Sequence, residues 1–140
     1  LATPLSIDGL GAYDTILRMA MLSKLDSLPK ARAMLPFVSM SYGKPSRYSW
    51  VHRSGATRIV DQAEGGEQGD PLMPMLFALG IHDALERARS ELQDGEHLFA
   101  YLDDVYAVCQ LGRVRDIYES LSHHLREVAG ICQHKSKTRV

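Results

Sequence analysis

The chain has 140 residues, of which 45% are hydrophobic, enough to build one core but not two. Its formal net charge of −1 argues against a free-standing nucleic-acid-binding protein, because phosphate contacts normally require a basic surface. No apolar run is long enough to span a bilayer and no signal-peptide pattern opens the chain, so we expect a soluble protein with no membrane partner. Two cysteines, too few for a disulfide framework, favour an intracellular location.

The first predicted strand runs from about Thr3 to Asp8 and ends in a carboxylate. Gly9 and Gly11 then let the backbone turn into a helix predicted from Ala12 to about Leu25. Apolar residues on several faces of that helix indicate burial over much of its circumference. The amides of Gly11 and Ala12, at the helix start, would suit a phosphate group; a plain turn is the alternative explanation of the glycines.

A second helix is predicted from Lys30 to about Ser41, and strands from Arg47 to His52 and from Thr57 to Asp61 form a hairpin. The hairpin carries a group of cationic or titratable side chains, namely Arg47, His52, Arg53 and Arg58. They would contact the backbone of a template or primer strand, or else form an ordinary solvated face. The sequence favours neither interpretation.

A polar, glycine-rich loop from Gln62 to Gly69 precedes a helix predicted from Pro71 to about Leu92. Asp70 has the residue type and the position of a helix N-cap. The stripe expected to be buried along this helix consists of Leu72, Met75, Leu76, Leu79, Ile81 and Leu85.

The segment from Phe99 to Val108 places two adjacent carboxylates between runs of β-branched, aromatic and small apolar residues. That pattern is typical of a hairpin whose tip carries the polar chemistry. Because no glycine stands at the tip, we expect Leu102 or Asp103 to hold a strained backbone. Close carboxylates repel unless a cation neutralises them, and their oxygens suit Mg²⁺ or Mn²⁺ better than zinc or copper. A solvated turn is the alternative.

The last helix is predicted from Gly112 to Ala129 and is ended by Gly130. Its inward residues would be Val114, Ile117, Leu121, Leu125 and Val128. His123 and His124 point in different directions on a helix, which predicts surface or interface residues rather than a shared metal site. Cys109 and Cys132 form neither a disulfide framework nor zinc spacing, so we expect buried thiols.

Taken in order, four segments resemble the palm motifs of reverse transcriptases. They are the run that ends at Asp8 with the following Gly9–Asp14, the Gln-Gly-Asp-Pro-Leu loop, the Tyr-x-Asp-Asp box, and the segment from Gly130 to Thr138. The resemblance is closest to the non-LTR retrotransposon and group II intron type. It implies an α+β fold over residues 1–140: an antiparallel sheet with helices packed on one face, the palm of a right-hand polymerase with a ferredoxin-like core. It also implies a fragment, with fingers before Leu1 and thumb after Val140.

The resemblance implies RNA-directed DNA synthesis, in which an RNA template, a DNA primer and a dNTP meet at a two-metal site. The implied ligands of two Mg²⁺ (or Mn²⁺) ions are Asp8, Gly9, Asp103 and Asp104. Lys137 joins the three aspartates as a catalytic residue, at the family position of a lysine proposed to protonate or stabilise the pyrophosphate leaving group. The implied nucleotide-binding residues are Gly11, Ala12, Tyr13, Gln68 and Gly69, and the implied primer contacts are Tyr101 and Leu102.

Several alternatives remain open at this stage. Tyr13 matches the family's steric gate against a ribose 2′-hydroxyl, but core packing also explains an aromatic there. Lys137 is otherwise a flexible surface lysine, and His134 stands where the family commonly has asparagine. An RNA-directed RNA polymerase palm usually has Gly-Asp-Asp at the hairpin, where this chain has Leu102. A non-catalytic retroelement remnant, acting as an interaction module, is a third possibility.

Overall fold

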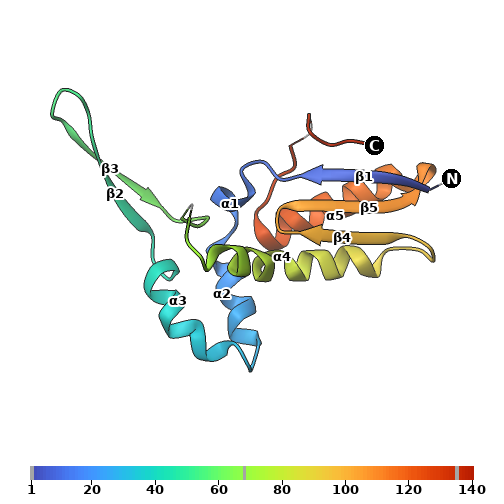
Figure 1. Ribbon diagram of the computed structural model, residues 1–140, viewed down its shortest axis with the longest axis horizontal. Helices are drawn as coiled ribbons and strands as arrows, with labels where there is room; N and C mark the ends of the chain where they lie inside the picture. Colours follow the sequence, from blue (N-terminus) through green and yellow to red (C-terminus); the bar gives the residue numbers. More distant parts are fainter. Residues whose placement is uncertain (1, 68, 135) are drawn as a thin grey trace.

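The computed structural model describes residues 2–67, 69–134 and 136–140 (Figure 1). Helices and strands are mixed along the described part of the chain, with two short 3₁₀ turns. In chain order the elements are β1 (Ala2–Asp8), α1 (Ala12–Thr15), α2 (Arg18–Ser27), the 3₁₀ turn η1 (Arg32–Met34), α3 (Leu35–Tyr42), β2 (Ser46–Val51), β3 (Thr57–Gln62), α4 (Met73–Ser90), β4 (His97–Tyr101), β5 (Asp104–Gln110), the 3₁₀ turn η2 (Leu111–Arg113) and α5 (Val114–Ala129).

The central sheet has three antiparallel strands in the order β1-β5-β4. On the outer side of β1, the C-terminal segment pairs through isolated bridges that join Ser6 to Arg139 and Gly9 to Gln133. The order C-terminal segment, β1, β5, β4 is the order of a ferredoxin-like sheet, with a bridge-paired segment where the fourth strand would lie.

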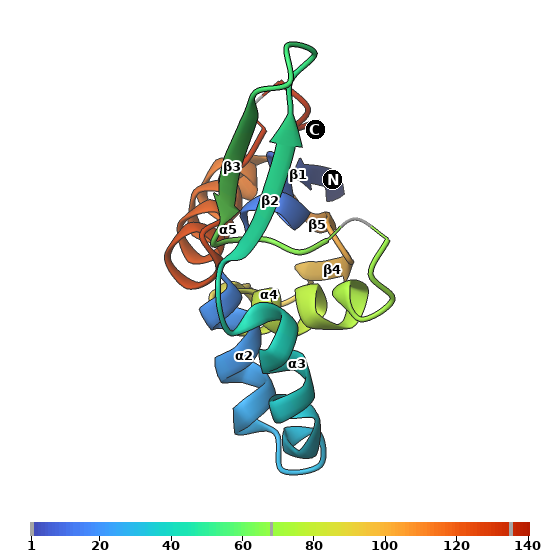
Figure 2. The ribbon, with the colours of Figure 1, turned by 90° about the vertical axis from the view of Figure 1, so that its left-hand side faces the viewer.

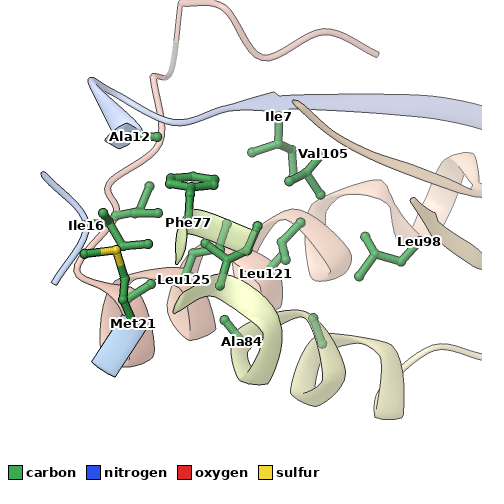
Figure 3. Close-up of a cluster of buried hydrophobic side chains, with 14 of the residues drawn as sticks. Ile7, Ala12, Ile16, Met21, Phe77, Ala84, Leu98, Val105, Leu121 and Leu125 are labelled. Carbon is green, nitrogen blue, oxygen red and sulfur yellow. The ribbon is translucent and has the colours of Figure 1, made fainter. Parts of the chain in front are cut away.

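One face of the sheet is buried and the other is open, because successive residues of a strand point to opposite faces. Helices α4 and α5 cover the buried face; in Figure 1, α4 runs below the strands and α5 runs behind them. Figure 3 shows side chains from the sheet and from the helices meeting in one core, among them Ile7, Phe77, Leu98, Val105, Leu121 and Leu125. The predictions of an antiparallel sheet and of helices on one of its faces are therefore confirmed.

The prediction of one helix from Ala12 to Leu25 was wrong, because α1 ends at Thr15 and α2 starts at Arg18. Between them Ile16 and Leu17 are extended, with ψ of 134° and 119°. The Leu17 N–H donates to the Ala129 carbonyl at 2.9 Å, and the Ile16 carbonyl accepts from the Gly65 N–H at 2.8 Å. These long-range bonds replace helical ones, so the break follows from tertiary contacts rather than from the local apolar pattern.

The other helices lie close to their predicted positions. The second predicted helix is shorter than expected and forms η1 followed by α3, while α4 starts two residues after Pro71 and α5 two residues after Gly112. Met75 was wrongly placed in the buried stripe of α4, because it is exposed. The buried face of α4 consists of Met73, Leu76, Phe77, Gly80, Ile81, Ala84 and Ala88.

Gly130 ends α5 with φ of 72°, as predicted, and its N–H donates to the Arg126 carbonyl at 3.0 Å. Of the two cysteines, Cys109 is buried but Cys132 is exposed, so the expectation of buried thiols was wrong for Cys132. None of the helices that the structure describes is both long and apolar enough to cross a membrane.

Strands β2 and β3 form a separate two-stranded sheet that projects away from the rest of the molecule (Figures 1 and 2). Helices α2 and α3 extend on the other side (Figure 2). Every residue of the two strands is exposed except Ser46 and Gln62 at the base, which are half-buried. The predicted hairpin is confirmed, and both of its faces are open.

Candidate active site

A cleft of about 530 Å³ lies where the carboxyl end of β1 meets the loop before α4. Its walls come from five separate parts of the chain: the β1–α1 turn, α1, the loop that precedes α4 with the first turn of α4, the β4–β5 turn, and the C-terminal segment. The lining residues are Asp8, Gly9, Gly11, Ala12, Tyr13, Asp14, Gly66, Glu67, Gly69, Asp70, Met73, Pro74, Asp103 and Lys137.

Asp8 and Asp103 both line this cleft, although they are far apart in the sequence. The strand register pairs Asp8 directly with Asp104, and pairs Asp104 with Tyr101 on its other side. Directly paired residues project from the same face, which here is the open face because Ile7 and Val105 are buried. The three predicted carboxylates thus come from adjoining strand ends. Asp104, however, does not line the cleft itself.

The ammonium of Lys137 lies 2.9 Å from Oδ2 of Asp8. The Lys137 N–H donates to the His134 carbonyl at 2.9 Å, and the His134 N–H donates to the Asp8 carbonyl at 2.8 Å. These bonds dock the C-terminal turn against the end of β1 and bring the lysine over the carboxylate. Because the Lys137 side chain is 63% exposed, the pair adds little stability; its main consequence is that it neutralises one of the clustered carboxylates.

The oxygen atoms that face the cleft are of the kind that binds a hard divalent cation. Asp8 and Asp103 offer carboxylate oxygens, Gly9 offers a backbone carbonyl, and the ammonium on Asp8 shows that a positive charge is accommodated there. Within residues 2–67, 69–134 and 136–140, no group of three or more histidine, cysteine or acidic side chains is already close enough to hold a metal ion. A site with three such side chains would therefore need a third one to move closer.

Tyr13 has a structural role and a place in the cleft at the same time. Its ring stacks on Phe77 with a centroid separation of 4.4 Å and an interplanar angle of 9°. Burial raises the pKa of the Tyr13 phenol, and the negative charge of Asp103 raises it further. The core-packing interpretation is thus confirmed, while the steric-gate role stays a prediction about a ring that Phe77 holds in place.

The remaining predicted nucleotide-binding residues are distributed along the same cleft. Gly11, Ala12 and Gly69 line it, whereas Gln68 lies outside the described residues. Gly69 has φ of 89°, and no described heavy atom lies within 4 Å of the point where a Cβ would stand. A glycine is required there by conformation, and the space beside it is open. Because α1 has only four residues, its dipole offers a phosphate less than the predicted long helix would.

The tip of the β4–β5 hairpin is a two-residue turn at Leu102 and Asp103. Leu102 has φ of 56° and is the only residue other than glycine with positive φ in the part of the chain that the structure describes. The predicted strain at the tip is therefore confirmed. The turn directs Asp103 to the cleft, while Tyr101 remains exposed beside it. Primer contact by Tyr101 and Leu102 stays a prediction.

Sequence reasoning missed Arg18, which is 5% exposed and organises the wall of the cleft. Its Nε donates to the Gly65 carbonyl at 2.8 Å, and its Nη1 donates to the Lys44 carbonyl at 2.8 Å. Its Nη2 donates to Ser46 Oγ at 3.0 Å. One side chain thus ties α2 to the base of the β2–β3 hairpin and to the loop that follows it. The available signal was a single arginine inside an otherwise apolar run from 16 to 22.

Tyr42 and Asp70 extend this arrangement to the start of α4. The Arg18 guanidinium lies 5.3 Å from the Tyr42 ring centroid, and the Tyr42 hydroxyl donates to Asp70. Burial and the bond to Asp70 raise the pKa of Tyr42 to about 12. Asp70 Oδ1 also accepts from the Leu72 N–H at 2.8 Å. Leu72 occupies the N-cap position, so the prediction of Asp70 as N-cap was wrong; Asp70 holds the preceding turn.

No protein-family model matches the chain. The Retrotransposable element SLACS 132 kDa protein of Trypanosoma brucei gambiense is 25% identical to it over 134 residues. That match covers 96% of this chain, and the chain spans 11% of the length of this curated relative.

Solved telomerase structures are similar over almost the whole chain. Apo telomerase from Candida tropicalis, truncated from its C-terminal domain, has a TM-score of 0.74 at 12% identity, covering 99% of this chain and 30% of the telomerase chain. Telomerase from Candida albicans, in complex with a TWJ fragment of telomeric RNA, has a TM-score of 0.71 at 14% identity, covering 99% and 27%. The fold is reverse-transcriptase-like.

Within this reverse-transcriptase-like fold, the end of β1, the β4–β5 turn and the C-terminal segment supply Asp8, Asp103 and Lys137. The β1–α1 turn, α1 and the loop before α4 supply the glycines, Tyr13 and the other three lining carboxylates. Among the described residues, the arrangement offers five carboxylates, the Lys137 ammonium and the Tyr13 ring around one open volume. Chemically, it suits a polyanionic substrate that arrives with divalent cations.

Proposed function

We propose that this chain is the palm of an RNA-directed DNA polymerase, whose cleft adds dNTPs to the 3′-hydroxyl of a DNA primer on an RNA template. The observation that carries the proposal is that Asp8 and Asp103 line one cleft, with Lys137 paired to Asp8. The similarity to a retrotransposon protein and the reverse-transcriptase-like fold support it.

Asp8 and Asp103 would hold two Mg²⁺ or Mn²⁺ ions, with Asp104 and the Gly9 carbonyl at the edge of the site. When bound, such ions supply activation of the primer hydroxyl and charge neutralisation of the triphosphate. Asp104 faces Asp8 across the strand pair, so even where it does not touch an ion it deepens the negative potential that attracts one.

Lys137 has two successive roles in this proposal. Without a divalent cation it neutralises Asp8 at 2.9 Å. With a cation on Asp8, the exposed ammonium would be free to pair with the phosphates of the nucleotide, and it would hold a proton at Nζ for the pyrophosphate leaving group.

Tyr13 and the glycines would position the nucleotide. The stacked Phe77 prevents the Tyr13 ring from retreating into the core, so the ring would clash with a ribose 2′-hydroxyl and favour deoxynucleotides. The open space beside Gly69 would let the nucleotide approach the backbone closely.

Divalent-cation binding tests the site directly on this chain. We expect Asp8→Asn and Asp103→Asn each to weaken Mn²⁺ binding, followed by the electron paramagnetic resonance signal of free Mn²⁺, by about tenfold or more, because each removes a charged ligand. Asp94→Asn is the matched control, since Asp94 is exposed and lies outside the cleft.

Primer extension tests the reaction. In the longest natural polypeptide that contains these residues, called the longer product below, we expect Asp103→Asn to lower dNTP incorporation on an RNA template by about a hundredfold or more. The fold of this variant should stay near normal. Asp94→Asn should extend the primer normally. Unchanged incorporation by Asp103→Asn would remove the catalytic assignment.

A further inference from the structure

The two faces of the β2–β3 hairpin differ in chemistry. The register pairs Tyr48 with Val60 and Trp50 with Arg58, and directly paired residues share a face. We call this set, Tyr48, Trp50, Arg58 and Val60, the stacking face. The opposite face consists of Arg47, Ser49, Val51, Thr57, Ile59 and Asp61.

The stacking face presents two aromatic rings to solvent. Trp50 is 52% exposed and Tyr48 is 37% exposed. The ring of His52 lies edge-on to Trp50 at a centroid separation of 5.4 Å, which extends the aromatic surface toward the tip of the hairpin. Exposed aromatic rings beside arginine are the combination on which unpaired bases stack in proteins that bind single-stranded nucleic acid.

The charge of the hairpin is opposite to that of the whole chain. Residues 46–62 carry three arginines and one aspartate, a net charge of +2, whereas the chain carries −1. The single acid, Asp61, is 2.8 Å from Arg47 on the opposite face, and that pairing lowers the pKa of the Asp61 carboxyl. Among the described residues, no carboxylate lies within ion-pair distance of Arg53 or Arg58. Both are therefore available to phosphates.

The stacking face is continuous with the cleft. The Tyr48 hydroxyl donates to the carboxylate of Glu67, and Glu67 lines the cleft. At the base of the hairpin, Arg18 holds Ser46 and Gly65. A strand that lies along the stacking face would thus reach the rim of the cleft without leaving the protein surface.

We propose that the stacking face binds single-stranded nucleic acid, with bases stacked on Trp50 and Tyr48 and phosphates on Arg53 and Arg58, and that it leads this strand to the cleft. The proposal rests on the proposed function only in naming the strand as the template. A protein partner could bury apolar surface on either face of the hairpin. The side chains of Arg53 and Arg58 and the larger aromatic rings lie instead on the stacking face and at the tip, which favours nucleic acid.

Trp50 is the only tryptophan of the chain, so its fluorescence reports directly on the stacking face. The experiment titrates this chain with unstructured RNA or DNA oligonucleotides of about 12 nucleotides, a length within the usual site size. No divalent cation and no dNTP are present. We expect quenching that saturates and weakens as salt is raised, because phosphate contacts release counterions.

Two exposed substitutions separate the faces. Tyr48→Ser should weaken binding by about fivefold or more, because it removes one stacking ring. Val51→Ser, the matched control on the opposite face, should leave the affinity unchanged. Arg58→Gln should weaken binding and lower its salt dependence. A second readout, the anisotropy of a labelled oligonucleotide, follows binding independently of the tryptophan.

Three outcomes would overturn the proposal: no quenching and no anisotropy change, equal losses from Tyr48→Ser and Val51→Ser, or self-association of the chain that Trp50→Ser abolishes. Tighter binding of RNA than of DNA supports the template assignment, and the reverse preference refutes it. Quenching without primer extension by the longer product would refute the proposed function but leave this inference standing. Primer extension without quenching would refute this inference and leave the proposed function standing.

Discussion

At the scale of single residues, the pair between Asp8 and Lys137 links the charge balance of the cleft to its proposed chemistry. Asp8 faces Asp104 in the strand register and shares the cleft with Asp103, so an unpaired carboxylate there would meet repulsion from both. Lys137 relieves that repulsion in the absence of metal. If Asp8 holds a divalent cation, as we propose, Lys137 would compete with that cation for the Asp8 carboxylate.

Lys137→Met tests this competition. We expect Mn²⁺ to bind about two- to tenfold more tightly to the variant, because the cation no longer has to displace the Lys137 ammonium from Asp8. The gain is modest because solvent already screens part of that ion pair. In the longer product, incorporation should fall even though the metal binds better, since the proton donor is lost. Titration calorimetry measures the affinity.

Lys30→Met is the control for the loss of one positive charge, because Lys30 is exposed and lies outside the cleft. Should Lys137→Met weaken Mn²⁺ binding, the competition would be refuted, and Lys137 would instead help to shape the cation site.

At the scale of the elements, the wall of the cleft depends on bonds between segments that are not adjacent in sequence. The loop before α4 is fastened to α1, since the Gly66 N–H donates to the Tyr13 carbonyl at 3.0 Å. Gly65 has φ of 65°, and a Cβ there would stand 2.3 Å from the Asp14 carbonyl oxygen. This close approach excludes any other residue at position 65 without a shift of the backbone. Arg18 then holds the same loop from the other side.

Arg18→Met keeps the length of the side chain and removes its donors. We expect a loss of about 2–4 kcal/mol in the free energy of unfolding, because the Gly65 and Lys44 carbonyls would lose their partner while buried or half-buried. Urea unfolding, followed by circular dichroism, measures the loss. Arg87→Met on exposed α4 surface is the control and should change stability by less than about 0.5 kcal/mol.

Amide hydrogen exchange separates this role from general stability. The amides of Gly65 and Gly66 should exchange faster in Arg18→Met even where global unfolding is negligible. Uniformly faster exchange across α4 and α5 would show instead that Arg18 supports only the fold as a whole.

At the scale of the whole molecule, the end of the sheet far from the cleft is closed by a buried ion pair. Glu96 has a side chain that is 4% exposed; it accepts from the Gln93 N–H at 2.8 Å and lies 3.2 Å from Arg113 Nε. The backbone bond from Gln93 lowers the pKa of Glu96 below its ordinary 4.5, and the Arg113 guanidinium lowers it further against the opposing effect of burial. The pair joins the start of β4 to the start of α5.

The stability of the fold should therefore depend on pH through Glu96. Because the folded-state pKa lies below the unfolded one, the contribution of Glu96 is complete above about pH 4.5 and is lost as the pH falls through the folded pKa. We expect Glu96→Gln to be less stable than wild type at pH 7 by about 1–3 kcal/mol, and the difference to shrink at acidic pH.

Denaturant unfolding from pH 7 down to about pH 3 measures the effect, with Glu127→Gln on the exposed surface of α5 as the control. A deficit of Glu96→Gln that stays constant over this range would show that shape, and not charge, sets the contribution of Glu96.

Most of the helices and strands, and the strand ends at which the carboxylates stand, follow from the amino-acid sequence alone. Alternating and helical apolar periods predicted β1, both hairpins, α4 and α5, because such periods arise from local backbone geometry. The missing glycine at the β4–β5 tip predicted the positive φ found at Leu102. Most of the residues named from the resemblance to reverse transcriptases do share one cleft. Tyr101, Leu102 and Asp104 do not line it, and Gln68 lies outside the described residues.

Packing between distant segments, in contrast, produced the break at Ile16 and Leu17, the burial of Arg18 and the bond from the Tyr42 hydroxyl to Asp70. Each depends on hydrogen bonds to groups far away in sequence, such as the Leu17 N–H to the Ala129 carbonyl, and no local pattern encodes which distant partner will be present. The same holds for Lys137, whose contact with Asp8 exists because the C-terminal segment pairs beside β1. Local periodicity defines elements, whereas the satisfaction of buried polar groups is settled by how the elements pack.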